Sequence, residues 1–288
     1  MKYFPEHFHA RQHMLRNDFE AFYYADDAMR PVAPHRHNFY ELLFFMEGSV
    51  TYMAADRPYP LQPGDLLIIP SSVSHHPVFG ENKRCRRVVL WVTEEFVRTL
   101  PQGAELAQCF PQGEEACLYR FSPSDSERLF DRAMAVTEEL SYARPLSDTM
   151  SLLLITELLI LLHRMIPTSA QNHPEDSTSE QLVHDVVRFI NDNLTRELPL
   201  DYIADHFFIS KFYLSRVFKR YMNVTPHSYV TQRRLAMAKR LLYDGLPPTE
   251  VYRRCGYTDY SSFYRAFKQE FGISPRQYRK LQEPGEAT

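Results

Sequence analysis

Short apolar runs separated by turn residues occupy the chain from about residue 35 to residue 93. Gly48, Pro63-Gly64 and Pro70 break the runs, and breaks at this spacing are typical of short strands in an all-β sandwich or barrel. We therefore expect a β-rich unit whose strands follow four apolar runs: YELLFFMEG, SVTYMAA, DLLIIP and RRVVLWVT.

After residue 122 the apolar period changes to three and four residues, which predicts amphipathic helices. The first segment, SPSDSERLFDRAMAVTEELSYA, opens with Ser and Asp residues that suit a helix cap. A second helix is expected over about 147–166, and its apolar surface is larger than one partner helix would cover. We interpret 122–166 as a helical dimerisation region; the alternative is that the second helix only packs on the β-rich unit. The leucines that supply this surface are Leu153, Leu154, Leu158, Leu161 and Leu162.

The stretch PTSAQNHPEDSTS, residues 167–179, is polar, contains two prolines and has no hydrophobic period. Such a composition is typical of a linker. The chain is therefore predicted to have a β-rich domain over 1–121, the helical region after it, the linker, and a helical domain over 180–288. The fold class is α+β.

The segment after the linker contains an internal repeat. A shift of 49 residues aligns LSRVFKRYMNVTPHSY (214–229) with FYRAFKQEFGISPRQY (263–278). Each copy follows a short predicted helix, at 200–207 and at 247–255, and a short connection. A short helix, a tight turn and a second helix rich in Arg, Lys, Ser and Tyr form the helix-turn-helix pattern, whose second helix enters the major groove of DNA.

Charge is distributed unevenly along the chain. Residues 196–283 contain 16 Lys and Arg against 8 Asp and Glu, whereas the whole chain has a net charge of −3. This asymmetry indicates that the C-terminal part meets a polyanion. The alternative is that the two basic helices are ordinary solvated amphipathic helices, but the repeat and the turn spacing favour binding to double-stranded DNA.

The second copy resembles the signature of AraC/XylS-type bacterial transcription regulators, in the form GYTDYSSFYRAFKQEFGISPRQYR at 256–279. The resemblance implies two helix-turn-helix units joined by a helix, here 225–245, with small residues where this chain has Phe208 and Tyr252. It also implies homodimers on promoter DNA, and contact with RNA polymerase if the protein is an activator. The residues expected to face DNA, including the exposed lysines of each helix, are Phe212, Ser215, Arg216, Lys219, Tyr260, Ser261, Tyr264, Arg265 and Lys268.

The stretch HRHNFYE places His35, His37 and Glu41 on one face if it is extended, because strand side chains alternate with a period of two. Imidazole and carboxylate groups together suit a divalent metal. With His75, the set resembles the two motifs of the cupin barrel, which implies a cupin-like β-barrel with flanking helices. Three interpretations stay open: the four residues bind a small-molecule effector directly, they hold a metal, or they are structural remnants.

Two function classes are compatible with a cupin-like pocket. In the first, the pocket senses an effector, and nearby aromatic residues such as Phe39, Tyr40, Phe45, Tyr52 and Trp91 suit stacking on a carbohydrate. In the second, the chain is a metal-dependent cupin enzyme fused to a DNA-binding module. The DNA-binding resemblance favours the regulator, so no enzymatic activity is expected.

The remaining features favour the cytoplasm. The four cysteines lie without a CxxC pair, which indicates neither a disulfide framework nor a thiolate zinc site. The N-terminal residues contain no apolar run of the kind found in a signal peptide. The most apolar segment, 150–166, is interrupted by charged residues and is shorter than the ~20 residues that span a bilayer, so no contact with a membrane is expected.

Overall fold

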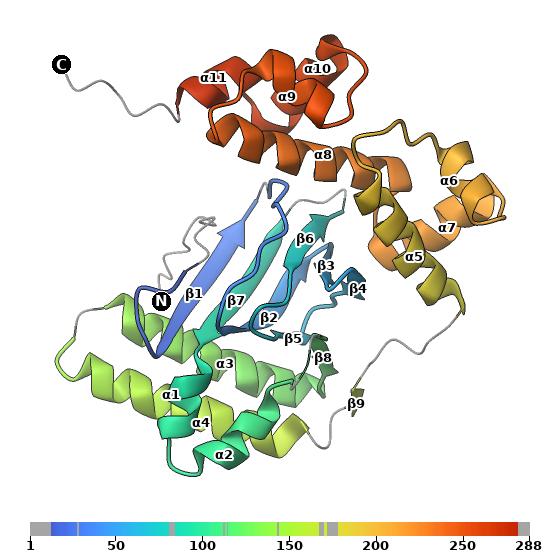
Figure 1. Cartoon of the computed structure of the whole chain (residues 1–288). Helices are drawn as coiled ribbons and strands as arrows, with labels where there is room; N and C mark the ends of the chain where they lie inside the picture. The colour runs from blue at the N-terminus through green and yellow to red at the C-terminus, as the bar shows by residue number, and fades with distance from the viewer. Residues whose placement is uncertain are drawn as a thin grey trace, which may run out of the picture. The chain divides into compact units, whose positions relative to one another are not determined.

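The computed structural model describes residues 13–27, 29–80, 84–111, 113, 115–142, 144–166, 170–171 and 178–281 (Figure 1). The chain forms two compact units. The first contains Met1–Met29, Pro34–His75 and Glu81–Asp176; the second contains Ser177–Thr288 with the short segments Arg30–Ala33 and His76–Gly80. Of the predicted domains, residues 1–12, 28, 81–83, 112, 114, 143, 167–169, 172–177 and 282–288 lie outside the described part.

Two sheets form the β-rich part of the chain. A six-stranded sheet has the order β1-β7-β2-β5-β8-β9, and a three-stranded sheet has the order β4-β3-β6. The central strand β2 pairs antiparallel with β7 on one side and with β5 on the other. The strands are β1 (Phe19–Asp26), β2 (Tyr40–Gly48), β3 (Val50–Ala54), β4 (Arg57–Pro60), β5 (Leu66–Ile69), β6 (His75–Phe79), β7 (Cys85–Val92), β8 (Cys117–Arg120) and β9 (Ala170–Gln171).

The large sheet has two different faces because side chains alternate along each strand. Tyr40, Leu42 and Phe44 of β2 belong to a hydrophobic core shared with the helices of the first unit. Their neighbours Glu41 and Leu43 therefore project to the opposite, interior face. This alternation places an ionisable side chain, that of Glu41, inside the barrel.

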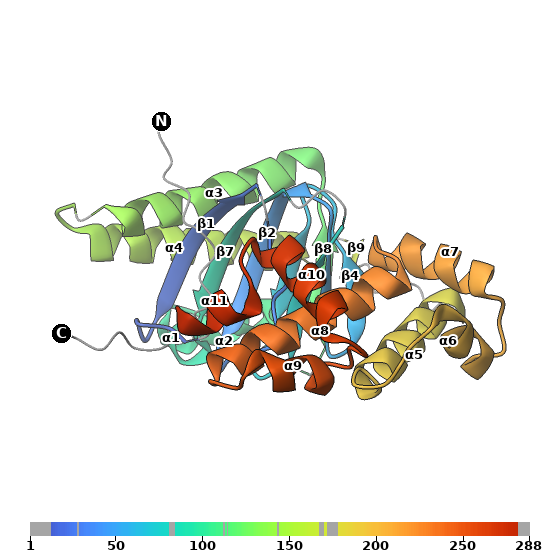
Figure 2. The same cartoon turned by 90° about the horizontal axis from the view of Figure 1, so that it is seen from above.

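Helices α3 (Pro123–Ser141) and α4 (Ser147–Met165) lie along one side of the large sheet, as Figure 2 shows. The side chain of Ser122 caps α3 by accepting a hydrogen bond from the backbone N–H of Asp125. Short helical turns precede the pair: α1 (Glu94–Thr99), α2 (Gly103–Leu106) and the 3-10 turn η1 (Ala107–Cys109).

From Thr178 onward, the described elements of the second unit are all helices. Its helices are α5 (Thr178–Asp192), α6 (Leu200–His206), α7 (Lys211–Met222), α8 (Pro226–Tyr243), α9 (Pro248–Arg254), α10 (Tyr260–Phe271) and α11 (Pro275–Lys280). Side-chain caps begin α7, α8, α10 and α11. The apolar stripe predicted for α10 is buried against α8. It forms the core that orients the helices of the second helix-turn-helix copy, and its residues are Phe263, Phe267 and Phe271, packed with Leu235 and Leu242.

Most of the predicted elements are present, and the misses have physical causes. Strands β2, β3, β5 and β7 lie on the four predicted apolar runs. The prediction missed β1, because its sequence FEAFYYAD mixes charged and aromatic residues, and β6, because HHPVF has no apolar run. Within the predicted linker, Ala170–Gln171 pairs with β8 and α5 already begins at Thr178.

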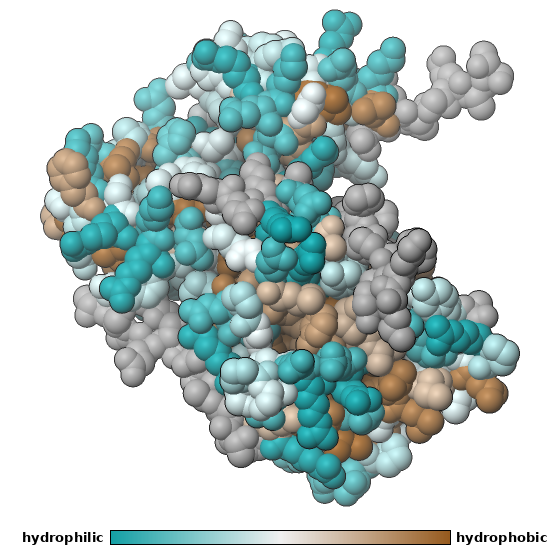
Figure 3. All heavy atoms as spheres, turned by 180° about the vertical axis from the view of Figure 1, so that it is seen from behind, coloured by the Kyte–Doolittle hydropathy of each residue, from teal (hydrophilic) through white to brown (hydrophobic). Residues whose placement is uncertain are grey.

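The leucines of α4 do not form one exposed stripe. Leu158, Leu161 and Leu162 are buried in the core of the first unit, so these three were wrongly assigned to a free dimerisation surface. Leu153 is 60% exposed, and Met150, three residues earlier on the same helical face, is also exposed. Leu146, the N-cap residue before the helix, is exposed as well. In Figure 3, hydrophobic side chains gather at lower right, where α3 and α4 lie.

Candidate functional site

Backbone hydrogen bonds bring the predicted histidines together. The His35 N–H donates to the His75 carbonyl at 3.1 Å, and the His75 N–H donates to the His35 carbonyl at 2.9 Å. The Ser72 N–H donates to the carbonyl of His37 at 2.6 Å. These hydrogen bonds hold the segment of His35 and His37 against the beginning of β6 at His75, although about 40 residues separate the two segments in the sequence.

Three side chains converge on one point inside the barrel. His37, Glu41 and His75 each offer a ligand atom, and these atoms lie within 4.8 Å of one another. Glu41 Oε2 is 3.4 Å from His37 Nε2 and 3.8 Å from His75 Nε2. All three side chains are buried. In the described part of the chain, this is the one group of three such side chains that could hold a metal ion.

The tautomers of the two histidines are fixed by the backbone. The Nδ1 atoms lie 2.9 Å from carbonyl oxygens, His37 from that of Phe39 and His75 from that of Val73. A carbonyl only accepts, so each Nδ1 carries a proton, and in the neutral imidazole each Nε2 then presents a lone pair. Among the described residues, neither Nε2 has a hydrogen-bond partner. With both imidazoles neutral, the cluster consists of acceptors: two imidazole nitrogens and a carboxylate.

Trp91 orients Glu41 from the neighbouring strand. Glu41 of β2 is opposite Trp91 of β7, and the indole Nε1–H donates to Glu41 Oε2 at 3.0 Å. Burial would raise the pKa of Glu41, but the close approach of His37 and the electrostatic attraction of His75 and His35 outweigh it and lower the pKa to about 2. Burial lowers the pKa of His75 to about 4, against the attraction of Glu41. At neutral pH the carboxylate is therefore ionised and His75 is neutral.

His35 lies at the edge of this cluster. It is partly exposed, and its ring centroid is 4.4 Å from that of His75 and 6.2 Å from that of His37. It is not one of the three converging ligand groups. The four predicted residues are thus neighbours, with three in a tight group and the fourth beside it.

Aromatic rings form the walls around the cluster. Phe39 stacks on His37 with ring centroids 3.9 Å apart, and Trp91 lies 4.8 Å from Phe39 and 4.9 Å from Phe22. Tyr40 is an exception to the predicted aromatic lining, because it belongs to the core on the helix side of the sheet. Phe22 was not predicted, since the strand that carries it was missed.

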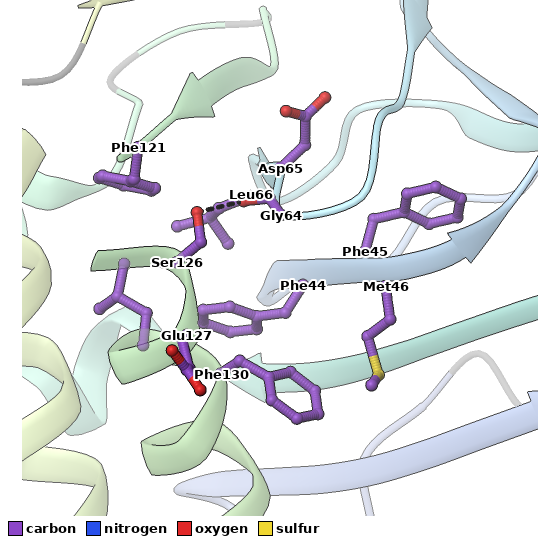
Figure 4. Close-up of a pocket in the computed structure, with 11 residues that line it drawn as sticks. Phe44, Phe45, Met46, Gly64, Asp65, Leu66, Phe121, Ser126, Glu127 and Phe130 are labelled. Carbon is purple, nitrogen blue, oxygen red and sulfur yellow. Dashed lines mark hydrogen bonds between the residues drawn. The ribbon is translucent and has the colours of Figure 1, made fainter. Parts of the chain in front are cut away.

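A cavity of about 180 Å³ opens on the other side of the large sheet, next to α3. Figure 4 shows Phe44 and Phe130 beside it, and the Ser126 hydroxyl donating to the Gly64 carbonyl. Phe44 and Leu66 belong to the helix-side core, so this cavity is separate from the histidine cluster.

The predicted DNA-facing residues lie on the two second helices of the repeat. On α7, Phe212, Arg216 and Lys219 are exposed, and on α10, Ser261, Arg265 and Lys268 are exposed. Ser215, Tyr260 and Tyr264 are partly exposed. The apolar faces of both helices are buried, so each helix presents its polar and basic side chains to solvent, as the pattern predicted.

The one donor and the two carbonyl acceptors that orient the cluster were not evident from the sequence. Nothing in the chain marks Trp91 as the donor to Glu41, because the contact depends on the register between β2 and β7. The carbonyls of Phe39 and Val73, which fix the tautomers, carry no sequence signal at all. Trp91 was predicted among the aromatic residues near the pocket, but Val88–Val92 of β7 is a continuous apolar run that does not tell which face Trp91 occupies.

Comparison with known proteins assigns both units. Residues 20–159 match the AraC-like ligand binding domain, and residues 203–281 match a helix-turn-helix domain. The C-terminal domain of AraT, a response regulator from Geobacillus stearothermophilus, is similar at 31% identity, covering 39% of this chain and 94% of that chain with a TM-score of 0.36.

Two full-length relatives match most of the chain. The HTH-type transcriptional activator RhaS of Escherichia coli O81 (strain ED1a) is 28% identical over 251 residues, which cover 85% of this chain and 87% of RhaS. RhaS of Shigella sonnei (strain Ss046) is 27% identical over 251 residues, which again cover 85% of this chain and 87% of that protein. Because one match falls on the barrel and the other on the helical repeat, the chain belongs to the AraC family of transcription regulators, with a ligand-binding domain followed by a helix-turn-helix DNA-binding domain.

Proposed function

We propose that this regulator senses a donor-rich small molecule at the cluster of His37, Glu41 and His75, with His35 as an additional contact. The observation that carries the proposal is the set of converging acceptors in a buried site. Buried polar groups cost free energy unless they are paired. A ligand that donates several hydrogen bonds would supply donors for the Nε2 atoms of His37 and His75 and for the carboxylate of Glu41.

A carbohydrate is the ligand class that this chemistry suits best. Sugar hydroxyls donate to imidazole nitrogens and carboxylates, and the C–H faces of a sugar ring pack against aromatic rings such as Phe39 and Trp91. The neutral state of His75 and the ionised state of Glu41 keep the cluster in its accepting form at physiological pH.

A divalent metal ion is the second candidate occupant, favoured by a separate observation. Tetrahedral zinc with bonds of roughly 2.0–2.2 Å places its ligand atoms roughly 3.3–3.6 Å apart. Here His37 Nε2 lies 3.4 Å and His75 Nε2 lies 3.8 Å from Glu41 Oε2, and all the ligand atoms lie within 4.8 Å of one another. Both imidazoles donate their Nδ1–H to a carbonyl, as histidines that bind metal commonly do. His37, Glu41 and His75 would hold the ion, which would act as a Lewis acid toward an oxygen of the effector.

On the DNA side, we propose that α7 and α10 read promoter DNA. Phe212, Ser215 and Arg216, with Tyr260, Ser261, Tyr264 and Arg265, would contact base edges, and Lys219 and Lys268 would contact phosphates. Contact with RNA polymerase would follow if the protein is an activator, as its relative RhaS is named.

We further propose a homodimer that uses the exposed face of α4. Met150 and Leu153 are 47% and 60% exposed and share one face of the helix, and Leu146, the N-cap residue, is 79% exposed. Apolar side chains grouped on one face commonly mark an interface. This assignment replaces the wider leucine surface predicted from the sequence.

The regulator is preferred to the enzyme because the relatives are transcription regulators. A cupin-type metal enzyme would use the same three ligand groups, so turnover of a bound sugar is the alternative. No described helix combines the length and apolarity that crossing a bilayer requires. We place the protein in the cytoplasm, where bacterial promoters are.

The test uses the single tryptophan of the chain as a reporter. Trp91 touches Glu41, so a ligand that binds the cluster should change its fluorescence. A panel of monosaccharides, each with and without zinc, should contain one that shifts Trp91 emission and changes the affinity of the full chain for duplex DNA. Emission changes that leave DNA affinity constant, together with consumption of the sugar, would favour the enzyme and contradict the proposal.

A further inference from the structure

The two helix-turn-helix units contain the same turn with different residues at its left-handed position. In the first unit, the N–H of Phe208 donates to the carbonyl of Asp205 and that of Ile209 to the carbonyl of Ala204, at 3.2 and 3.1 Å. In the second unit, the Gly256 and Tyr257 N–H groups make the same two bonds, at 3.0 Å each, to Arg253 and Tyr252. Both turns are Schellman motifs, in which the residue after the C-cap is left-handed.

The left-handed residue is glycine in one turn and phenylalanine in the other. Gly256 has φ of 78°, and Phe208 has φ of 55°. An L-residue with a Cβ adopts this conformation at a steric cost that glycine avoids. Gly256 is required for space as well, since an added Cβ would lie 2.4 Å from the Leu194 carbonyl oxygen. No such need explains the choice of residue at the first turn.

Burial does not compensate for the strain at Phe208. Its side chain is 97% exposed, the highest value among the exposed large hydrophobic residues. The ring therefore contributes no packing to the folded domain, and its backbone position disfavours it. Backbone strain that the fold does not need is a feature of functional sites.

The position of Phe208 in the motif indicates that the exposed ring faces DNA. It lies two residues before Ser210, whose hydroxyl caps α7 by accepting the Tyr213 N–H at 3.1 Å. The N-terminal end of this second helix is the end that contacts bases in helix-turn-helix proteins. Phe212, 78% exposed, follows in the first turn of the same helix.

The charge around these rings matches DNA. Helix α7 has the sequence KFYLSRVFKRYM, with no acidic residue and four cations, Lys211, Arg216, Lys219 and Arg220, all of them exposed. Cations beside an exposed aromatic ring complement a duplex, whose phosphates alternate with apolar sugar faces and thymine methyl groups. An apolar protein partner is disfavoured, because it would bury the four cations of α7 without pairing them.

We propose that Phe208 is a DNA contact of the first helix-turn-helix unit, additional to the base-facing positions of the motif. Its ring packs on a deoxyribose or a thymine methyl group at the edge of the groove that α7 enters, and the left-handed backbone directs it there. The inference rests on the proposed reading of DNA by α7.

The test compares stability with DNA affinity in full-length variants, using a duplex that the wild-type chain selects from a random-sequence pool. Phe208→Gly relieves the backbone strain and removes the ring, so its denaturation midpoint should rise while its Kd for the duplex rises roughly tenfold. Phe208→Tyr keeps the ring and should bind within about twofold of wild type. Tyr243→Ala removes an exposed aromatic side chain at the end of α8, outside both turns, and serves as the matched control.

Opposite changes in stability and affinity for Phe208→Gly, with Tyr243→Ala unchanged, would support the inference. Wild-type affinity of Phe208→Gly for the duplex would overturn the inference. The same holds if this variant kept its DNA affinity and lost only its binding to a second copy of the chain or to RNA polymerase, because Phe208 would then contact protein. If the wild-type chain enriched no duplex, the proposed DNA reading would fail together with the inference, whereas equal affinities overturn the inference alone.

Discussion

Replacing Glu41 with glutamine separates the three interpretations of the histidine cluster. The amide has the shape of the carboxylate, so its oxygen can still accept the Trp91 N–H, which now lies 3.0 Å from Glu41 Oε2. Its NH₂ group can donate to His37 Nε2, which is 3.4 Å from the carboxylate and has no hydrogen-bond partner among the described residues. The variant thus exchanges a charged acceptor for a neutral group that is both donor and acceptor.

The expected change in stability without ligand is small. A hydrogen bond to a charged group contributes about 1.5–3 kcal/mol and a neutral one about 0.5–1.5 kcal/mol, so about 1 kcal/mol is lost at Trp91. A new hydrogen bond to His37 returns a similar amount, and a buried charge is removed. The free energy of unfolding of Glu41→Gln should therefore stay within about 1 kcal/mol of wild type in urea denaturation with a chelator present.

The effect on a bound cation should be much larger. Removing a hydrogen-bond partner of a metal ligand typically costs 10–100-fold in affinity, so loss of the anionic ligand itself should cost at least about 100-fold. Zinc titration followed by Trp91 fluorescence measures this directly. Glu139→Gln is the matched control, since Glu139 is a buried carboxylate on α3 that accepts from the Ser147 hydroxyl, away from the cluster.

Each interpretation has its own outcome. Zinc binding that is tight in wild type and in Glu139→Gln but weak in Glu41→Gln supports the metal. No response to zinc, with loss of the sugar response in Glu41→Gln, supports direct effector binding. A loss of about 3 kcal/mol or more in Glu41→Gln without ligand would refute the reasoning, because the carboxylate would then be a structural partner of protonated histidines.

Three further variants test the remaining assignments. Arg265→Ala should weaken binding to the selected duplex by about 1–3 kcal/mol and relax the sequence preference, whereas Lys268→Ala should weaken all duplexes to a similar degree and reduce the salt dependence of binding; equal behaviour of the two would contradict the division into base and phosphate contacts. Leu153→Ala and Leu158→Ala differ in exposure, 60% against 0%. The first should favour the monomer in analytical ultracentrifugation with little change in unfolding, and the second should lower the free energy of unfolding of the first unit by about 2–5 kcal/mol; a stable, fully dimeric Leu153→Ala would remove α4 from the interface. Phe267→Ala opens a cavity beside Phe271 and Tyr278, whose ring centroids lie 4.5 and 5.7 Å away. It should destabilise the second unit by about 3–5 kcal/mol in urea denaturation, and a cost under 1 kcal/mol would show that the aromatic core is not tightly packed.

The sequence determined those features that depend on local spacing. Helices α7 and α10 follow from apolar residues at three and four positions, and the 49-residue repeat shows that one unit occurs twice. Strands β2, β3, β5 and β7 follow from apolar runs bounded by Gly and Pro. His35, His37 and Glu41 were also found from spacing, because alternation along an extended segment places them on one face. The resemblance to the cupin motifs added His75 to this group.

The tertiary structure decided which of these residues act together. Pairing between β2 and β7 places Trp91 against Glu41, and two backbone carbonyls select the histidine tautomers. Packing of α4 on α3 and the sheet buries Leu158, Leu161 and Leu162 and leaves Leu153 outside. The left-handed turn at Phe208 is visible only as a backbone angle. Each of these depends on contacts between segments far apart in the chain, and local spacing carries no information about strand register, burial or backbone strain.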